Sequence, residues 1–113
     1  MLAKAQRITS ADDYKRVVRR GRRMSGANCV TYQLMNPNGG PPRFGFIVAK
    51  TVGNAVVRNR VRRRLKAAAL SMTAGLPDGA ETVFRALPPA AHADFAELST
   101  EVERSASRLA VKS

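Results

Sequence analysis

The stretch VGNAVVRNRVRRRLKAAAL at residues 52–70 combines a helical apolar repeat with dense positive charge. At 100° per residue, five apolar side chains fall within about a quarter of the helix circumference. They are Val57, Val61, Leu65, Ala68 and Met72. Asn54, directly after Gly53, is a good N-cap, and Gly75 and Pro77 end the pattern. We therefore expect a helix over about residues 54–73, with one side packed on a sheet.

The other faces of this helix are basic. Six of the nine residues at 58–66 are positively charged, and five of those six are arginines. Arg58, Arg62 and Lys66 follow one another at i, i+4 and i+8, where like charges cost about 0.2–0.5 kcal/mol per pair. Most of the remaining outer surface is filled by Arg60, Arg63 and Arg64. Because guanidinium groups make two-point contacts with phosphate oxygens, we expect the helix to bind a polyanion.

Polar residues at the start of the helix extend this expected surface. Asn59 adds an uncharged donor and acceptor for a base edge, a ribose hydroxyl or a phosphate. If Gly53 and Asn54 open the helix, its free backbone N–H groups form a second anion site. Lys50 leads directly into this turn and adds another positive charge.

The net charge of +12 is concentrated in one part of the chain. Residues 14–73 contain fourteen Lys or Arg and no Asp or Glu, whereas the rest holds six basic and eight acidic residues. Ordinary surfaces mix both signs, because opposite neighbours relieve self-repulsion. A nucleic acid is therefore the expected partner, and a membrane is not, because no Trp or Phe anchor accompanies the basic helix.

The composition argues against catalysis by the protein alone. Metal-dependent phosphodiester hydrolysis needs clustered carboxylates, but all eight lie outside the basic span and none forms a ligand-like motif. His92 is the sole histidine, and the sole cysteine, Cys29, excludes an intramolecular disulfide. With no signal-peptide pattern and no apolar stretch near the ~20 residues that cross a bilayer, we expect a cytoplasmic protein.

The rest of the sequence predicts a single α+β domain spanning residues 1–113. Ser10 and Gly21 are the expected caps of a first helix. The further elements are expected at 11–20 (helix), 27–35, 43–50 and 82–87 (strands) and 92–110 (helix). The first two strands are expected to form a hairpin around NPNGGPP. Residues 1–8 and 111–113 are expected to be a flexible lead-in and tail.

The chain resembles the bacterial ribonuclease P protein subunit family along nearly its whole length. The central motif consists of Lys50, VGNAV at 52–56, RNR at 58–60, Arg62, Arg63 and Lys66. Further matches in family order are Arg7-Ile8, Asp13-Tyr14, Val17, Gly21-Arg22-Arg23, Tyr32, FGFIV at 44–48 and Ala90-Ala91. A gapped pattern of this length is far more specific than a lone basic block.

The resemblance implies an α-β-β-β-α-β-α sandwich with a left-handed βαβ crossover, hence one more strand, which we place around 48–52. It implies a protein that joins a catalytic RNA to remove the 5′ leader from precursor tRNA. The active site and its magnesium ions are then expected in the RNA and not at a protein site. The alternative from composition alone is a ribosomal-type or other basic nucleic-acid-binding protein without a processing role.

The resemblance also implies roles for individual residues. The arginine-rich helix and its preceding loop are expected to contact RNA through Lys50, Gly53, Asn54, Arg58, Asn59, Arg60, Arg62, Arg63 and Lys66. Arg64 lies on the same helix and is also expected to contact RNA. Tyr14 and Tyr32 match positions that stack on leader bases in a cleft between the first helix and the sheet. Val18 lines the same cleft but departs from the family, in which many members have an aromatic residue there. For both tyrosines, packing in the core is the alternative.

Overall fold

The computed structural model describes residues 2–111, which fold into three helices and one four-stranded sheet. The helices and strands are α1 (Ala11–Arg20), β1 (Arg22–Ser25), β2 (Cys29–Met35), β3 (Arg43–Ile47), α2 (Ala55–Met72), β4 (Ala80–Ala86) and α3 (Phe95–Val111). The order α-β-β-β-α-β-α confirms the expected α+β fold. Short 3-10 turns lie at Lys4–Gln6, Lys50–Val52, Thr73–Gly75 and Pro88–Ala91.

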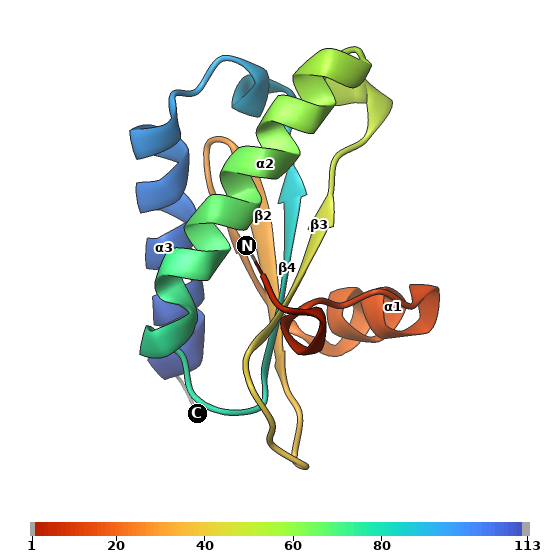
Figure 1. Cartoon of the computed structure of the whole chain (residues 1–113), viewed down its shortest axis with the longest axis vertical. Coiled ribbons are helices and arrows are strands. Elements are labelled where there is room, and N and C mark those ends of the chain that lie inside the picture. The colour runs from red at the N-terminus through yellow and green to blue at the C-terminus, as the bar shows by residue number, and fades with distance from the viewer. Residues whose placement is uncertain (1, 112–113) are drawn as a thin grey trace.

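The sheet has the spatial order β1-β2-β4-β3. The pairs β1/β2 and β2/β4 are antiparallel, and β3/β4 is parallel. In Figure 1 the chain rises along β3, descends along α2 in front of the sheet and rises again along β4, to the left of β3. This β3-α2-β4 connection is therefore left-handed, against the right-handed rule that holds in about 98% of such units.

Two layers of side chains fill the two faces of the sheet. On one face, Phe44 and Phe84 stack with ring centroids 6.3 Å apart, beneath α2 and α3. On the other face, Val17 of α1 packs on Val30, Tyr32 and Val83. The sheet is thus covered by α2 and α3 on one side and by α1 on the other.

Side-chain caps begin α1 and α2 at the residues that the sequence indicates, whereas α3 begins at Phe95 and not near the expected residue 92. Ser10 Oγ accepts from the Asp13 N–H at 3.0 Å, and Asn54 Oδ1 accepts from the Val57 N–H at 2.9 Å. Gly53 precedes α2 with φ +158°, and a Cβ there would lie 2.8 Å from Val57 Cγ1. Glycine is therefore required at the turn that leads into the basic helix.

Three expectations from the sequence are wrong. Strands β2 and β3 are not a hairpin, because β4 lies between them, and the hairpin is formed by β1 and β2. The additional strand is β1, whereas the segment around 48–52 contains a 3-10 turn. The lead-in is not a loose end, because Leu2 and Ile8 are buried and the Ile8 N–H donates to Phe44 O at 2.8 Å. In the expected tail, Val111 ends α3 and residues 112–113 lie outside the described range.

Candidate nucleic-acid interface

Helix α2 is divided into a buried side and a polar side. Val61, Leu65 and Ala68 are 0% exposed and pack in the cluster beneath α2 and α3. The predicted apolar stripe is confirmed, with Met72 buried at its end and Val57 partly buried at its beginning. This packing holds the basic residues in a fixed row on the outer faces of α2.

Two arginines of this row bind the chain segment that precedes α3. Arg60 Nη2 donates to Ala91 O at 3.0 Å, and Arg64 Nη1 donates to Ala93 O at 2.8 Å. Both side chains are half-buried. Arg60 and Arg64 therefore contribute to the docking of α2 against the segment after β4, whatever further contacts they make with RNA.

Two other basic residues of the row lie on the side of α2 that faces away from Ala91 and Ala93, which we call the open flank. Arg62 and Lys66 line a hollow together with Tyr14, Phe46 and residues 7–9. Arg62 Nη1 also donates to Asn59 Oδ1 at 3.0 Å, which holds the guanidinium along the helix surface. This flank thus joins positive charge to the apolar surface near α1.

The remaining predicted RNA contacts lie at the start of α2 and on its exposed surface. Lys50, Asn54, Asn59 and Arg63 are exposed. Arg58 is half-buried, and its Nε is a buried donor without a hydrogen-bond partner within residues 2–111. The Asn54 side chain accepts a hydrogen bond from one of the N–H groups at the start of α2. The other N–H groups of the first turn could still donate to an anion, as expected for this site.

Two acidic residues form ion pairs with Arg16 of α1 and Arg43 of β3. The buried Glu81, 1% exposed, pairs with Arg16 and Arg43, each at 2.8 Å. Asp13 bridges the same two arginines, at 3.0 and 3.2 Å. The hydrogen bond from Arg16 is the main reason why the pKa of Asp13 is lowered. None of the ion pairs found within residues 2–111 involves α2, whose charges are left without internal counterions.

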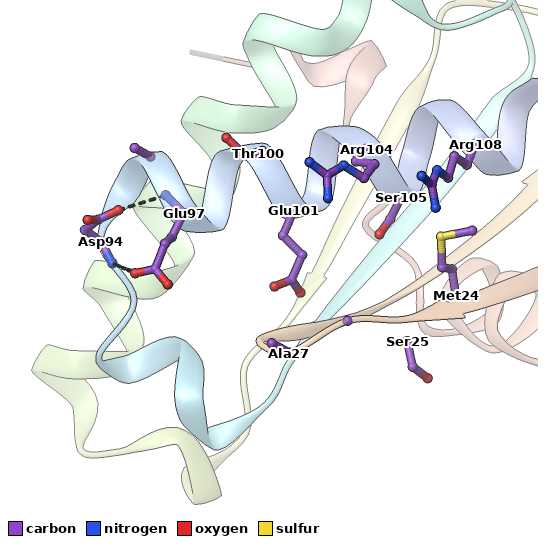
Figure 2. Close-up of a pocket in the computed structure, with 12 residues that line it drawn as sticks. Met24, Ser25, Ala27, Asp94, Glu97, Thr100, Glu101, Arg104, Ser105 and Arg108 are labelled. Carbon is purple, nitrogen blue, oxygen red and sulfur yellow. Dashed lines mark hydrogen bonds between the residues drawn. The ribbon is translucent and has the colours of Figure 1, made fainter.

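The carboxylates of α3 also serve the fold. Figure 2 shows Glu101 pointing from α3 to the β1–β2 hairpin, where it accepts from the Asn28 N–H at 3.0 Å and the Cys29 N–H at 2.8 Å. Asp94 and Glu97 cap the start of α3 through reciprocal hydrogen bonds to each other's backbone N–H. These carboxylates therefore have structural partners and do not offset the charge of α2.

Tyr14 lines a cleft beside α1. The Phe46 N–H donates to Tyr14 Oη at 3.0 Å, and the ring lies over Gly45, where a Cβ would be 2.5 Å from Tyr14 Cε1. Tyr14 and Phe46 line both the hollow below Arg62 and a second hollow that continues to Lys15 and Ile47. The half-buried Tyr14 ring thus stands between the basic flank of α2 and the floor of the cleft.

The other two predicted cleft residues differ in accessibility. Val18 is half-buried on α1, consistent with a wall of the cleft. Tyr32 is only 4% exposed and belongs to the core beneath α1, so its ring is not available for direct stacking on a base. This corrects its expected role. The Arg85 guanidinium lies over the Tyr32 ring. The sequence did not predict this contact, because the run TVFRAL does not indicate which side chains of the strand face solvent.

Two observations bear on metal binding and on nucleophilic chemistry by the described side chains. Within residues 2–111, no three His, Cys, Asp or Glu side chains gather to hold a metal ion. Burial raises the pKa of the Cys29 thiol to about 12, with a smaller contribution from Glu101. A thiol with this pKa is almost entirely protonated at neutral pH and is a poor nucleophile. What this surface can do chemically is bind a polyanion that has both phosphates and stacking bases.

Comparison with known proteins gives one consistent result. The family model described as Ribonuclease P matches residues 2–110. The Ribonuclease P protein component of Clavibacter michiganensis is 50% identical over 88 residues, 78% of each chain, and that of Beutenbergia cavernae is 42% identical over 112 residues, 99% of this chain and 94% of that one. The solved structure of the RNase P protein from Staphylococcus aureus has a TM-score of 0.81 at 24% identity and covers 98% of this chain and 94% of its own. At that identity the structural likeness shows the fold alone.

Proposed function

Because the chain belongs to the ribonuclease P protein family, we propose that it assists a catalytic RNA in removing the 5′ leader from precursor tRNA. The protein binds both RNAs, and the cleavage chemistry and its magnesium ions belong to the catalytic RNA. Asp13 and Glu81 are paired with Arg16 and Arg43, and Asp94 and Glu97 cap the start of α3, so these four carboxylates already have partners in the protein. Because the substrate is made in the bacterial cytoplasm, we assign the protein to that compartment.

The observation that carries this proposal is the junction between α2 and the cleft. Arg62 and Lys66 share a hollow with Tyr14 and Phe46. Single-stranded RNA is bound where a positively charged groove follows the backbone and rings stack on the bases. A strand that leaves the basic flank of α2 can therefore enter the cleft directly. The 5′ leader is the single-stranded part of the proposed substrate.

Within residues 2–111, no helix has both the length and the apolar character that a bilayer span requires. A duplex-binding protein is a stronger rival, because the same basic helix could lie in a groove. The two functions differ in the RNA that they sense, since a duplex binder is indifferent to the length of a single-stranded leader.

The test is reconstitution at low magnesium concentration. The purified protein is mixed with the catalytic RNA of ribonuclease P and labelled precursor tRNA, and 5′ cleavage is followed against RNA alone and protein alone. We expect the protein to stimulate cleavage by the RNA and to cleave nothing by itself. Shortening the leader to one nucleotide should weaken binding of the precursor to the complex. Equal affinity for long and short leaders, without stimulation of cleavage, would exclude the proposed function.

A further inference from the structure

Arg85 is a charged residue in an otherwise apolar part of the sheet. It lies on β4, a central strand, and faces α1 together with Val83. Its neighbours in register are Val30 on β2 and Ile47 on β3, both in the apolar cluster on this face. Arg85 itself is exposed. It therefore lies on the α1 side of the sheet, beside Ile47, which lines the second hollow.

The guanidinium of Arg85 covers the buried tyrosine. Its Cζ lies over the Tyr32 ring, 6.0 Å from the centroid. Arg23 of β1 is the direct cross-strand partner of Tyr32 and is also exposed. An arginine over an aromatic face gains from the cation–π attraction and keeps its opposite face available. The accessible surface at this point is thus a guanidinium supported by a ring, and not the ring.

Arg85 has no carboxylate to neutralise it within residues 2–111. Glu81 faces the same side of β4, but both of its oxygens are engaged by Arg16 and Arg43. No ion pair of Arg85 is found within 4.0 Å in the described range. A cation held at the centre of an apolar floor without a counterion is therefore open to an external ligand.

We propose that Arg85 stacks on one base of the 5′ leader, with Tyr32 supporting the guanidinium from below. This inference rests on the proposed function, because the leader is the strand that would cross the cleft. Guanidinium planes stack on unpaired bases as aromatic rings do. Tyr14 receives the strand near α2, and Arg85 holds a base further along the floor. In this chain Arg85 thus stacks on the leader base in place of the Tyr32 ring.

The experiment compares Arg85→Met with wild type in the reconstituted complex with the catalytic RNA. The variant keeps an apolar stem over Tyr32 and removes the guanidinium. We expect it to bind leader-bearing precursor about tenfold more weakly and to bind mature tRNA with unchanged affinity. Arg104→Met is the matched control, because it removes an exposed arginine from α3 on the opposite side of the sheet. It should change neither affinity more than about twofold.

A scan with abasic nucleotides identifies the base. In wild type, loss of the stacked base at one leader position should weaken binding about tenfold. In Arg85→Met the same abasic position should cause no further loss, since the two changes remove one contact. Arg85→Lys keeps the charge without the plane and should behave like Arg85→Met in this scan. Complete recovery by lysine would show that a phosphate contact, and not stacking, is made here.

The outcomes separate this inference from the function on which it rests. If wild type does not distinguish precursor from mature tRNA, the proposed function fails. If wild type does distinguish them and Arg85→Met equals wild type, only the role of Arg85 fails. Equal weakening for precursor and mature tRNA, with thermal unfolding unchanged, would place Arg85 against another part of the complex and would overturn the inference.

Discussion

Arginines beside α1 and arginines on α2 have different kinds of partner. Arg16 of α1 and the neighbouring Arg43 of β3 both contact the buried Glu81 and the half-buried Asp13. On α2, Arg60, Arg62 and Arg64 donate to uncharged oxygens, which belong to Ala91, Asn59 and Ala93. The same side chain can therefore serve two purposes, depending on whether the fold supplies a counterion.

The difference indicates how charge is divided between folding and binding. A buried carboxylate that loses its cations is strongly destabilising, so the Arg16 and Arg43 pairs are needed before any RNA arrives. Cations on α2 repel one another in the free protein, and that repulsion is relieved when phosphates replace the missing counterions. We therefore expect substitutions beside α1 to lower stability and substitutions on the open flank of α2 to lower affinity.

The largest effect on stability is expected for Arg43→Met. The substitution leaves Glu81, which is 1% exposed, with Arg16 as its one remaining cation among residues 2–111. We expect the free energy of unfolding to fall by about 3 kcal/mol, measured by urea denaturation at neutral pH. Arg63→Met removes an exposed arginine from α2 and should stay within about 0.5 kcal/mol of wild type. Similar losses in both variants would remove the distinction between the two groups.

The largest effect on affinity is expected for the double variant Arg62→Ala/Lys66→Ala. Both side chains line the hollow next to Tyr14, and neither has a carboxylate partner among the described residues. We expect RNA affinity to fall about 10- to 100-fold and the salt slope to decrease by about 1.4 to 1.8, for two lost phosphate contacts. Stability should be unchanged. An unaltered slope would exclude these side chains from the interface, and Arg104→Ala/Arg108→Ala on α3 is the control with equal charge loss.

Replacing Arg60 and Arg64 together by methionine tests the intermediate case. Their carbonyl partners, Ala91 O and Ala93 O, connect α2 to the segment before α3. At about 0.5–1.5 kcal/mol for each hydrogen bond, unfolding should become easier by about 1–3 kcal/mol in total. The salt slope should fall less than in Arg62→Ala/Lys66→Ala. Full stability with an equally reduced slope would show that Arg60 and Arg64 belong functionally with the open flank.

Local signals allowed most elements to be predicted, whereas strand order was not encoded locally. Helix α1 has the expected bounds, because Ser10 and Gly21 mark its two ends. Strand β1 was missed because RRMS is short, charged and on the edge of the sheet, where no alternating apolar pattern is needed. The false hairpin arose because neighbouring strands in sequence usually pair, while here β4 inserts between β2 and β3.

The candidate site shows the same limit. Helical periodicity places the basic residues of α2 outside its apolar stripe, as expected. Periodicity cannot show that Arg60 and Arg64 bind the chain itself while Arg62 and Lys66 line an open hollow. The first pair contacts residues about thirty positions later in the chain, and the second pair lies near Tyr14, about fifty positions earlier. Nor can it show that Arg85 covers Tyr32, which requires the register of β2 against β4.

The smallest expected effect is the acid dependence of Asp13. Its side chain is 32% exposed, so water screens its contacts with Arg16 and Arg43. The pKa of Asp13 is lowered from 3.8 in the folded protein, chiefly by the hydrogen bond from Arg16. A lowered pKa means that the unfolded chain takes up the proton first as the pH falls. The stability contributed by this carboxylate is therefore complete well above pH 3.8 and is lost as the pH falls through the lower folded value.

Asp13→Asn isolates this contribution, because the cap of α1 uses the backbone N–H of residue 13 and the Ser10 hydroxyl, both of which the variant keeps. The difference in unfolding free energy between wild type and variant should be constant between about pH 5 and 7 and should shrink toward zero as the pH falls below 3.8 and through the lower folded pKa. RNA affinity at neutral pH should not change. A difference that persists at low pH would mean that residue 13 stabilises α1 through contacts of its neutral form. The ionic account of the arginines beside α1 would then rest on Glu81 alone.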